Sequence, residues 1–255
     1  MLTTTLAKIS DIEAPALAGF SAWPLDALAF ESDLAAVYPE NQIVYFSPGR
    51  NIIGASPARE GDSCAEARRW VAQNNATTLL QDGAVLGGLP RYQMPTAGFY
   101  SDLDAPVTDL TIAALVRVPN VSGFKSLATI GVNAATRAML YITGNDIAYQ
   151  HGTGDVKTST GTTVVADQWL VLLSSFQASD NALRVYANST ALLMSETMAN
   201  DIPAETRAAI GSTTAGAQPL VGEVALVMMW DRALHTDVVA LAKVMTAIGG
   251  LAALT

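Results

Sequence analysis

Residues 224–230 form an unbroken run of apolar residues, preceded by Gly222 and Glu223 and stopped by Asp231. A run this short, rich in valine and bounded by glycine and by charge, is more typical of a buried strand than of a helix. Both alternating faces of the run are apolar. Because a strand of this kind needs cover on both faces, we expect residues 224–230 to lie in the interior of a sheet.

From residue 77 onward, short segments of strand-like composition alternate with turns. Turn signals rich in Gly, Asn and Asp fall at residues 144–145, 152–155, 180–181 and 188–189. Many short strands with regular turns and little helix predict an all-β fold, an antiparallel two-sheet sandwich or jelly roll. The expected strands are residues 42–46, 77–80, 99–103, 110–118, 126–130, 138–143, 146–151, 169–176, 183–187, 191–197, 207–210 and 221–230.

A few short helices are expected beside the strands. Residues 25–37 place several apolar side chains roughly on one face. Ser63 and Glu66 form a capping box, which predicts a helix from Ser63 to about residue 74. The last helix is expected over residues 236–248, where a pair of glycines at 249 and 250 would end it.

The first 41 residues do not follow the strand pattern. Prolines at positions 15, 24 and 39 break any long helix there. Aromatic residues of this segment, which suit it to filling apolar pockets, are Phe20, Trp23 and Phe30. We therefore divide the chain into an N-terminal extension or anchoring arm, residues 1–41, and a sandwich domain, residues 42–255. The extension either folds back onto its own domain or docks onto another chain.

Charge and terminal sequence narrow the classes of function. The formal net charge is −9, which argues against a nucleic-acid-binding protein, because such proteins need clustered Lys and Arg. The N-terminus lacks a basic segment followed by a long apolar run, so we expect no secretory signal. No stretch is long and apolar enough to predict a membrane span. The single Cys64 cannot form an internal disulfide.

Four segments together resemble the laminin-G-like, concanavalin A-like jelly-roll family: residues 109–118, 167–176, 181–188 and 222–234. They occur in the order and with the spacing of that family over roughly residues 79–244. The resemblance implies a jelly-roll sandwich for residues 42–255, and it has no counterpart for the extension.

The apolar run departs from that family in one respect. Related strands usually carry charged residues at the positions of Ala225, Leu226 and Met228, which are apolar here. Leaving a Leu or Met exposed forgoes about 1.5–3 kcal/mol of burial, so we expect cover from the extension or from a neighbouring subunit. The candidate partner-contact residues are therefore Leu226 and Met228, together with Phe20, Trp23 and Phe30.

The sequence offers no strong catalytic site. The resemblance implies that a hydrolase of this fold would carry the string Glu-x-Asp-x-x-Glu, and no such string occurs. Asp102 and Asp104 share one face of an expected strand but lie at its end, a poor place for the paired carboxylates of a glycosidase. His151 and His235 have no adjacent Ser, Cys or ligand cluster, and we expect His235 on the surface. We expect no enzyme activity.

Calcium is the usual ion of the family that the chain resembles, bound by loop oxygens. Loop positions that carry such oxygens have no spacing that specifies a site: Asp102, Asp104, Asp155, Asp180, Asn181, Asn200 and Asp201. We therefore expect no cofactor and leave calcium as an alternative.

Three functions are compatible with these features, and fold alone does not choose among them. The first is a non-enzymatic structural or attachment protein of a bacteriophage particle, such as a capsid decoration or tail-fibre protein. It would be made in the host cytoplasm, reside in the virion and contact other virion proteins and copies of itself. The second is a lectin-like receptor-binding protein that recognises a cell-surface glycan through loop aromatic residues such as Tyr92, Phe99, Tyr100 and Tyr149. The third, a polysaccharide-cleaving enzyme, is disfavoured by the missing carboxylate pair.

Overall fold

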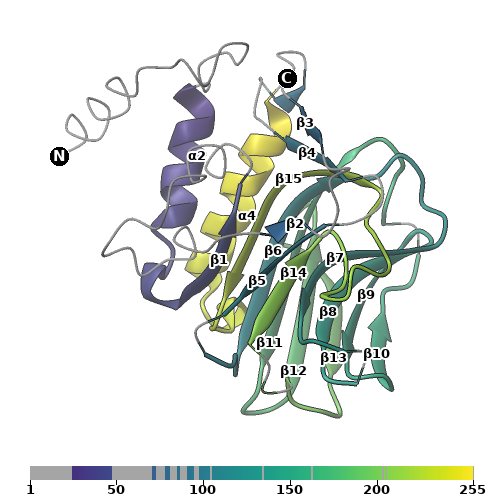
Figure 1. Ribbon diagram of the computed structural model, residues 1–255. Coiled ribbons are helices and arrows are strands. Elements are labelled where there is room, and N and C mark those ends of the chain that lie inside the picture. The colour runs from purple at the N-terminus through teal and green to yellow at the C-terminus, as the bar shows by residue number, and fades with distance from the viewer. Residues whose placement is uncertain are drawn as a thin grey trace.

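A computed structural model describes residues 25–47, 71–72, 78–80, 85–86, 91–94, 98–103, 105–133, 135–161, 163–202, 204 and 206–254. Within these residues, two antiparallel sheets pack face to face, and helices lie on one outer side of the sandwich (Figure 1). This arrangement confirms the expected all-β, concanavalin A-like jelly roll.

The strands of the first sheet, sheet A, are β1 (Gln42–Phe46), β3 (Thr78–Leu80), β4 (Arg91–Met94), β6 (Leu110–Arg117), β11 (Trp169–Gln177), β12 (Ala182–Ala187), β13 (Leu192–Thr197) and β15 (Gly222–Trp230). They run in the order β13-β12-β11-β6-β15-β4-β3, and β1 also pairs with β15. β15 therefore has β6 along one side and β1 and β4 along the other. The apolar run lies in the interior of a sheet, as the sequence predicted.

The strands of the second sheet, sheet B, are β2 (Val71–Ala72), β5 (Phe99–Asp102), β7 (Phe124–Ile130), β8 (Ala138–Thr143), β9 (Asp146–His151), β10 (Asp155–Thr158) and β14 (Arg207–Ile210). Their order is β10-β9-β8-β7-β14-β5-β2. Three short strands, β2, β4 and β10, were not among those expected. Val71, expected inside a helix that begins at Ser63, lies in β2, while Ser63 itself lies outside the described residues.

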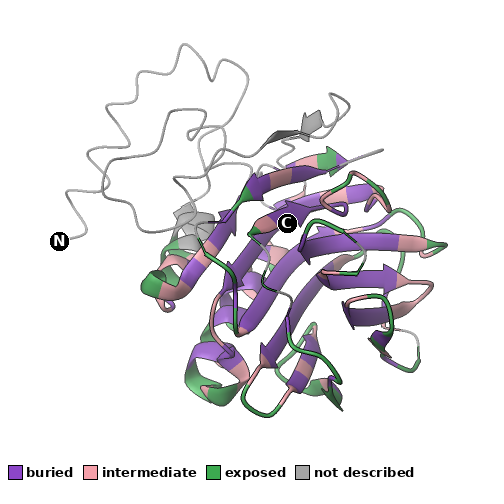
Figure 2. Cartoon of the chain, turned by 60° about the horizontal axis from the view of Figure 1, so that its bottom comes forward, coloured by how far each residue is buried: buried purple, intermediate pink, exposed green. Residues whose placement is uncertain are grey.

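Both faces of β15 are buried (Figure 2). Val224, Val227 and Met229 belong to the core between the two sheets. Residues of the opposite face belong to a second cluster on the outside of sheet A: Ala225, Leu226, Met228 and Trp230. A bulge between Val224 and Leu226 shifts the register with β6, so the simple two-residue alternation of the sequence is broken at this point.

Two helices of the chain itself cover the outside of sheet A: α2 (Leu25–Ala35) and α4 (Val238–Ala253). Leu34 of α2 and Val244 and Ile248 of α4 pack in the second cluster. Beneath them, Leu226 is 1% exposed and Met228 is 0% exposed. The expected partner contact at Leu226 and Met228 is therefore wrong, because the chain's own helices already bury both side chains.

The described part of the extension is attached to the sandwich. The indole Nε1 of Trp230 donates to the carbonyl of Val37 at 2.8 Å, and Nε2 of Gln42 donates to the carbonyl of Val37 at 3.0 Å. Residues 25–41 thus fold back onto their own domain. Phe20 and Trp23 lie outside the described residues, so partner binding by residues 1–24 stays a prediction. Among the described helices, none is long and apolar enough to cross a membrane.

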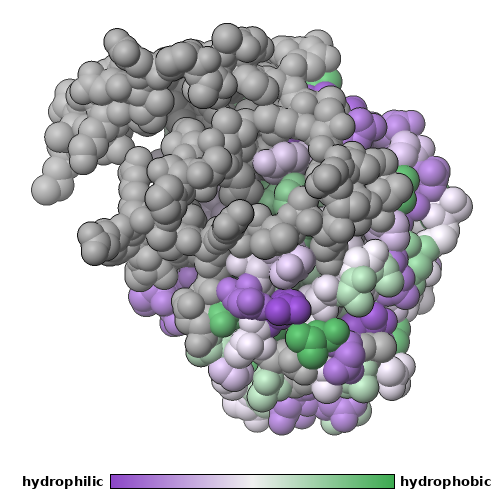
Figure 3. All heavy atoms as spheres, viewed as in Figure 1, coloured by the Kyte–Doolittle hydropathy of each residue, from purple (hydrophilic) through white to green (hydrophobic). Residues whose placement is uncertain are grey.

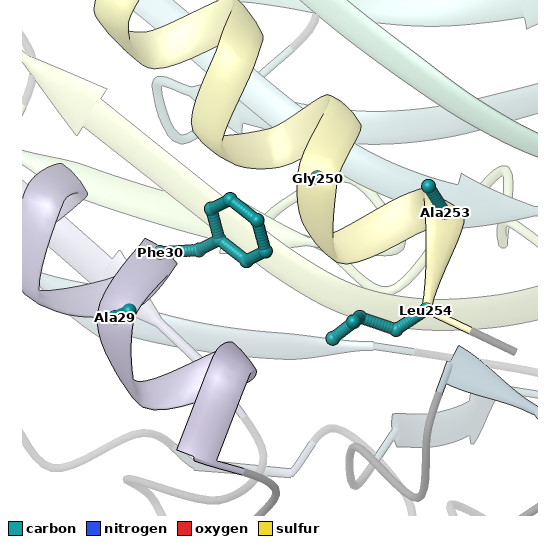
Figure 4. Close-up of a pocket in the computed structure, with 5 residues that line it drawn as sticks. All are labelled: Ala29, Phe30, Gly250, Ala253 and Leu254. Carbon is teal, nitrogen blue, oxygen red and sulfur yellow. The ribbon is translucent and has the colours of Figure 1, made fainter.

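α4 continues to Ala253, beyond the two glycines that were expected to end it. Phe30 of α2 points toward α4 at Gly250, and both residues line an apolar hollow of about 330 Å³ (Figure 4). A Cβ added to Gly250 would lie 2.3 Å from ring atoms of Phe30, whereas a Cβ added to Gly249 would meet nothing within 4 Å. Gly250 therefore permits the close approach of the two helices.

The two glycines form a matched pair for mutation. We expect Gly249→Ala to stabilise the protein by about 0.5–1 kcal/mol, because glycine in a helix loses more backbone freedom on folding than alanine. Gly250→Ala should lose that gain or reverse it, because the Phe30 ring must move away. Denaturant unfolding of both variants measures the difference in the free energy of unfolding. Equal stabilisation by both substitutions would contradict the contact between α2 and α4.

Candidate functional site

The outer face of sheet B lies on the opposite side of the sandwich from α2 and α4 (Figure 1). In β8, the side chains of Ala138, Leu140 and Ile142 join the core between the sheets. Met139 and Tyr141 therefore point outward, where they form a separate small cluster with Ala148 of β9. We call the surface formed by the outward-facing residues of β5, β7, β8, β9 and β14 the B face. Its polar and aromatic side chains make it the candidate site.

Two aromatic rings are stacked face to face on the B face. Phe124, at the start of β7, stacks on Tyr141 with the ring centroids 4.0 Å apart and an angle of 17° between the planes. Phe124 is half-buried, while Tyr141 is buried. Burial raises the pKa of the Tyr141 hydroxyl, so this side chain stays neutral at physiological pH. Such a pair can take the apolar face of a sugar ring.

Arg137, which immediately precedes β8, lies next to this pair. Its Nη1 is 3.4 Å from Oε1 of Gln218, and its Nη2 is 3.5 Å from Oε1 of Gln150. The Nε atom is buried without a hydrogen-bond partner. Burial lowers the pKa of Arg137, and the nearby Tyr141 partly offsets this shift. An arginine keeps its proton at pH 7 despite such a shift, so a positive charge is held here by two neutral amides.

The loop between β14 and β15 positions one of these amides. The backbone N–H of Ser126 in β7 donates to the carbonyl of Gln218 at 3.1 Å. The Thr129 hydroxyl donates to the carbonyl of Ser212 at 3.3 Å, so the loop crosses the B face at β7. Within the loop, the backbone N–H of Thr213 donates to the carbonyl of Ala217 at 2.9 Å. These bonds fix where the Gln218 side chain meets Arg137.

A second polar group lies on the same face at β5 and β14. Nε of Arg207 donates to Oδ1 of Asp102 at 2.7 Å, and the Arg207 guanidinium lies 5.2 Å from the centre of the Tyr100 ring. The hydrogen bond that Arg207 donates to Asp102 raises the pKa of Arg207. This group already pairs its two charges, in contrast to the guanidinium of Arg137.

The catalytic candidates of the sequence do not meet at a site. Asp102 is engaged by Arg207, and Asp104 lies outside the described residues. His151 is 0% exposed, with Nδ1 2.7 Å from the carbonyl oxygen of Asn200 and Nε2 3.2 Å from the Tyr149 hydroxyl. Burial lowers the pKa of His151. His151 therefore belongs to the interior and is out of reach of a substrate.

His235 was expected as a surface residue at the start of the last helix, and its position next to that helix is confirmed. It lies in η4 (Leu234–Thr236), a short 3₁₀ helix before α4, and is half-buried. Its Nδ1 is 2.9 Å from the Ser175 hydroxyl, and burial lowers the pKa of the imidazole. The contact ties the start of the helical layer to β11, which is a structural role.

The aromatic and metal-binding candidates are also distributed differently from expectation. Tyr149 and Phe99 are buried in the core and Tyr92 packs against it, so that among the four candidate aromatic residues only Tyr100 faces outward. The Asp155 carboxylate accepts from the backbone N–H groups of Ala199 and Asn200. Within the described part of the chain, no group of three or more His, Cys, Asp or Glu side chains converges.

The residues that build the B face were missed in the sequence, although their strands were expected. Alternation in residues 138–143 and 146–151 could have placed Met139, Tyr141 and Gln150 on outward positions. The stacking of Phe124 on Tyr141 and the meeting of Arg137 with Gln218 join residues from different strands and loops. No local pattern carries that information.

Three comparisons relate the chain to known proteins. A family model described as the concanavalin A-like lectin/glucanases superfamily matches residues 96–240, more than half of the chain. The comparison with curated proteins gave no match.

Two botulinum neurotoxin domains share the fold at low identity, and a third solved structure shows a weaker similarity. A botulinum neurotoxin serotype D binding domain has a TM-score of 0.55 and 7% identity over 83% of this chain and 52% of that domain. A botulinum neurotoxin type G receptor binding domain has a TM-score of 0.51 and 11% identity over 71% of this chain and 46% of that domain. The CBM40 of a Ruminococcus gnavus IT-sialidase, solved bound to α2,3-sialyllactose, has a TM-score of 0.46 and 13% identity over 54% and 83% of the two chains.

Proposed function

The chain belongs to the concanavalin A-like lectin/glucanases superfamily, and on that premise we propose that it is a non-catalytic protein that binds a glycan on the B face. The observation that carries this proposal is the stacked pair of Phe124 and Tyr141 beside Arg137, Gln150 and Gln218. A sugar ring offers an apolar C–H face and a rim of hydroxyls. An aromatic platform edged by a few convergent polar groups is complementary to both.

The chemistry around the platform favours binding over cleavage. Glycoside hydrolysis usually needs two carboxyl groups about 5–10 Å apart, one of them able to donate a proton. The polar side chains in contact at the platform are a guanidinium and two amides. None of these groups can exchange a proton at neutral pH, so we infer that the platform holds a glycan without turning it over.

Alanine in place of Phe124 tests this function. We expect Phe124→Ala to weaken glycan binding about tenfold, because about 1.4 kcal/mol of ring contact is lost. The wild-type ligand is first chosen on a glycan array, and both proteins are then titrated by calorimetry after thermal melts have shown that they are folded. Phe30→Ala, on the opposite side of the sandwich, is the control and should bind like the wild type.

Two further results would overturn the proposal. A wild-type protein that binds nothing on a broad array would exclude glycan recognition, and the release of reducing ends would show an enzyme instead. Repeating the glycan titration in the presence of a chelator tests for calcium. We expect the affinity for the glycan to be unchanged, and a loss of affinity would show that the loop oxygens bind an ion.

A second proposal concerns where the protein works. Within the extension, α2 packs on the outside of sheet A, on the other side of the sandwich from the B face (Figure 1). A chain held through residues 1–24 would therefore present the B face outward. With Phe20 and Trp23 as anchoring residues, we propose an attachment protein of a bacteriophage particle, a capsid decoration or tail-fibre protein. Its partners would be other virion proteins and further copies of itself.

A further inference from the structure

Arg137 differs from the other arginines described on the two sheets. Arg91 and Arg117 each contact the carboxylate of Glu223 at 2.5 Å, and Arg207 contacts Asp102 at 2.7 Å. Arg184 donates to backbone carbonyls of its own hairpin. Among the ion pairs of the described residues, none includes Arg137. A half-buried positive charge is therefore held at this position without an anion.

The neighbours of Arg137 compensate its charge poorly. The distances of 3.4 Å and 3.5 Å to Gln218 and Gln150 exceed the usual 2.7–3.2 Å for an N–H···O bond. The Nε atom of Arg137 and the hydroxyl of Thr136 beside it are both buried without a partner. Burying a charge with only weak hydrogen bonds carries an unfavourable desolvation free energy. An anion bound next to the charge would offset this free energy.

The place for that anion is at the end of the side chain. Arg137 is half-buried, and its Nη1 and Nη2 groups reach the half-buried Gln218 and the buried Gln150. A planar guanidinium matches the two oxygens of a carboxylate or of a sulfate ester through paired hydrogen bonds. The Arg137 guanidinium contacts Gln218, and Gln218 accepts from the backbone N–H of Ser126, the residue that pairs with Tyr141. A sugar ring stacked on Phe124 would therefore lie on the same face as these groups and could direct an acidic substituent toward them.

From these contacts we propose that the glycan bound on the B face is acidic and that Arg137 pairs with its carboxylate or sulfate group. The inference rests on the proposed glycan-binding function and narrows it to one class of sugar. The formal net charge of −9 disfavours non-specific attraction of polyanions by the chain as a whole. Recognition of an acidic sugar therefore needs a local positive charge, and Arg137 supplies one beside the aromatic pair.

The experiment compares matched ligands. Uronate-, sialate- and sulfate-bearing oligosaccharides are arrayed beside the carboxyl-reduced or desulfated form of each. We expect the acidic members to bind about 10- to 100-fold more tightly than their neutral counterparts, the range for a hydrogen bond to a charged group. The carboxylate and sulfate arms of the array distinguish the two sources of negative charge. Raising the salt concentration should weaken the binding of the acidic ligands only.

Variants assign the preference to Arg137. Arg137→Gln should abolish the difference in affinity between acidic and neutral ligands, and Arg137→Lys should retain part of that difference, because it keeps the charge but not the planar fork. Arg184→Gln, a change of the same type on sheet A, should leave both affinities unchanged. Melting curves confirm that each variant is folded.

The outcomes separate this inference from the function on which it rests. Equal binding of acidic and neutral forms, or an acidic preference that survives in Arg137→Gln, would refute the role of Arg137 and leave glycan binding standing. A protein that binds no member of either set would refute both.

Discussion

Val227→Asp is expected to prevent the chain from folding. Val227 is 0% exposed in the core between the sheets, and its backbone neighbours are Phe46 of β1 and Ala114 of β6. The substitution removes about 1.5–3 kcal/mol of apolar burial and adds the cost of an unpaired buried carboxylate, several kcal/mol more. Because a typical domain is stable by only about 5–15 kcal/mol, little or no folded protein should remain.

The measurement is soluble yield, followed by circular dichroism and a thermal melt. Val239→Asp provides the control, because Val239 is 75% exposed in the first turn of α4. A carboxylate near a helix N-terminus is neutral or slightly stabilising there. If Val227→Asp were soluble and melted cooperatively, the interior position of β15 would be wrong.

Deletion of residues 2–41 is expected to lower the melting temperature strongly or to cause aggregation, whereas deletion of residues 2–24 should leave the melt unchanged. The longer deletion removes Leu34 and Val37, which are buried against sheet A, and leaves the Trp230 indole without its acceptor. Each large apolar side chain uncovered forfeits about 1.5–3 kcal/mol. The shorter deletion ends before α2 and removes none of these contacts.

The same two deletions test attachment to a particle. Light scattering counts subunits, and co-sedimentation with particles measures binding. If residues 1–24 are the anchor, the chain without residues 2–24 should remain folded and lose assembly or particle binding. A full-length protein that stays monomeric at high concentration and binds no particle would count decisively against an anchor.

Most strands could be predicted from the sequence because each is indicated by the residue composition of its own short segment. The sequence could not predict the register shift in β15, because a bulge depends on the strand beside it. The apolar positions Leu226 and Met228 correctly indicated that cover was needed, and α4, which shares their apolar cluster, had already been expected as a helix. α4 is apolar along most of its length, and such a helix must itself be buried. Matching these two requirements would have identified the contact.

The candidate site was less predictable. Its aromatic pair joins β7 to β8, and its cation is distinguished by long contacts to two amides and by an Nε atom without a hydrogen-bond partner. A sequence shows that Arg137 exists, but the lack of a nearby partner is a property of the packed structure. Tyr100, by contrast, was foreseen as an aromatic residue available to a ligand, and it does face outward.

The position of β15 has a consequence for how the protein reaches its folded state. The strand that joins β1, β4 and β6 is the last strand of the chain. During synthesis, sheet A therefore lacks its central member until residues 222–230 have left the ribosome. Contacts between residues so distant in sequence form slowly, because closing the long intervening loops costs entropy before any contact forms. A nascent chain without β15 would expose the unpaired edges of β6 and β1, so that β15 must emerge before this sheet is protected from aggregation.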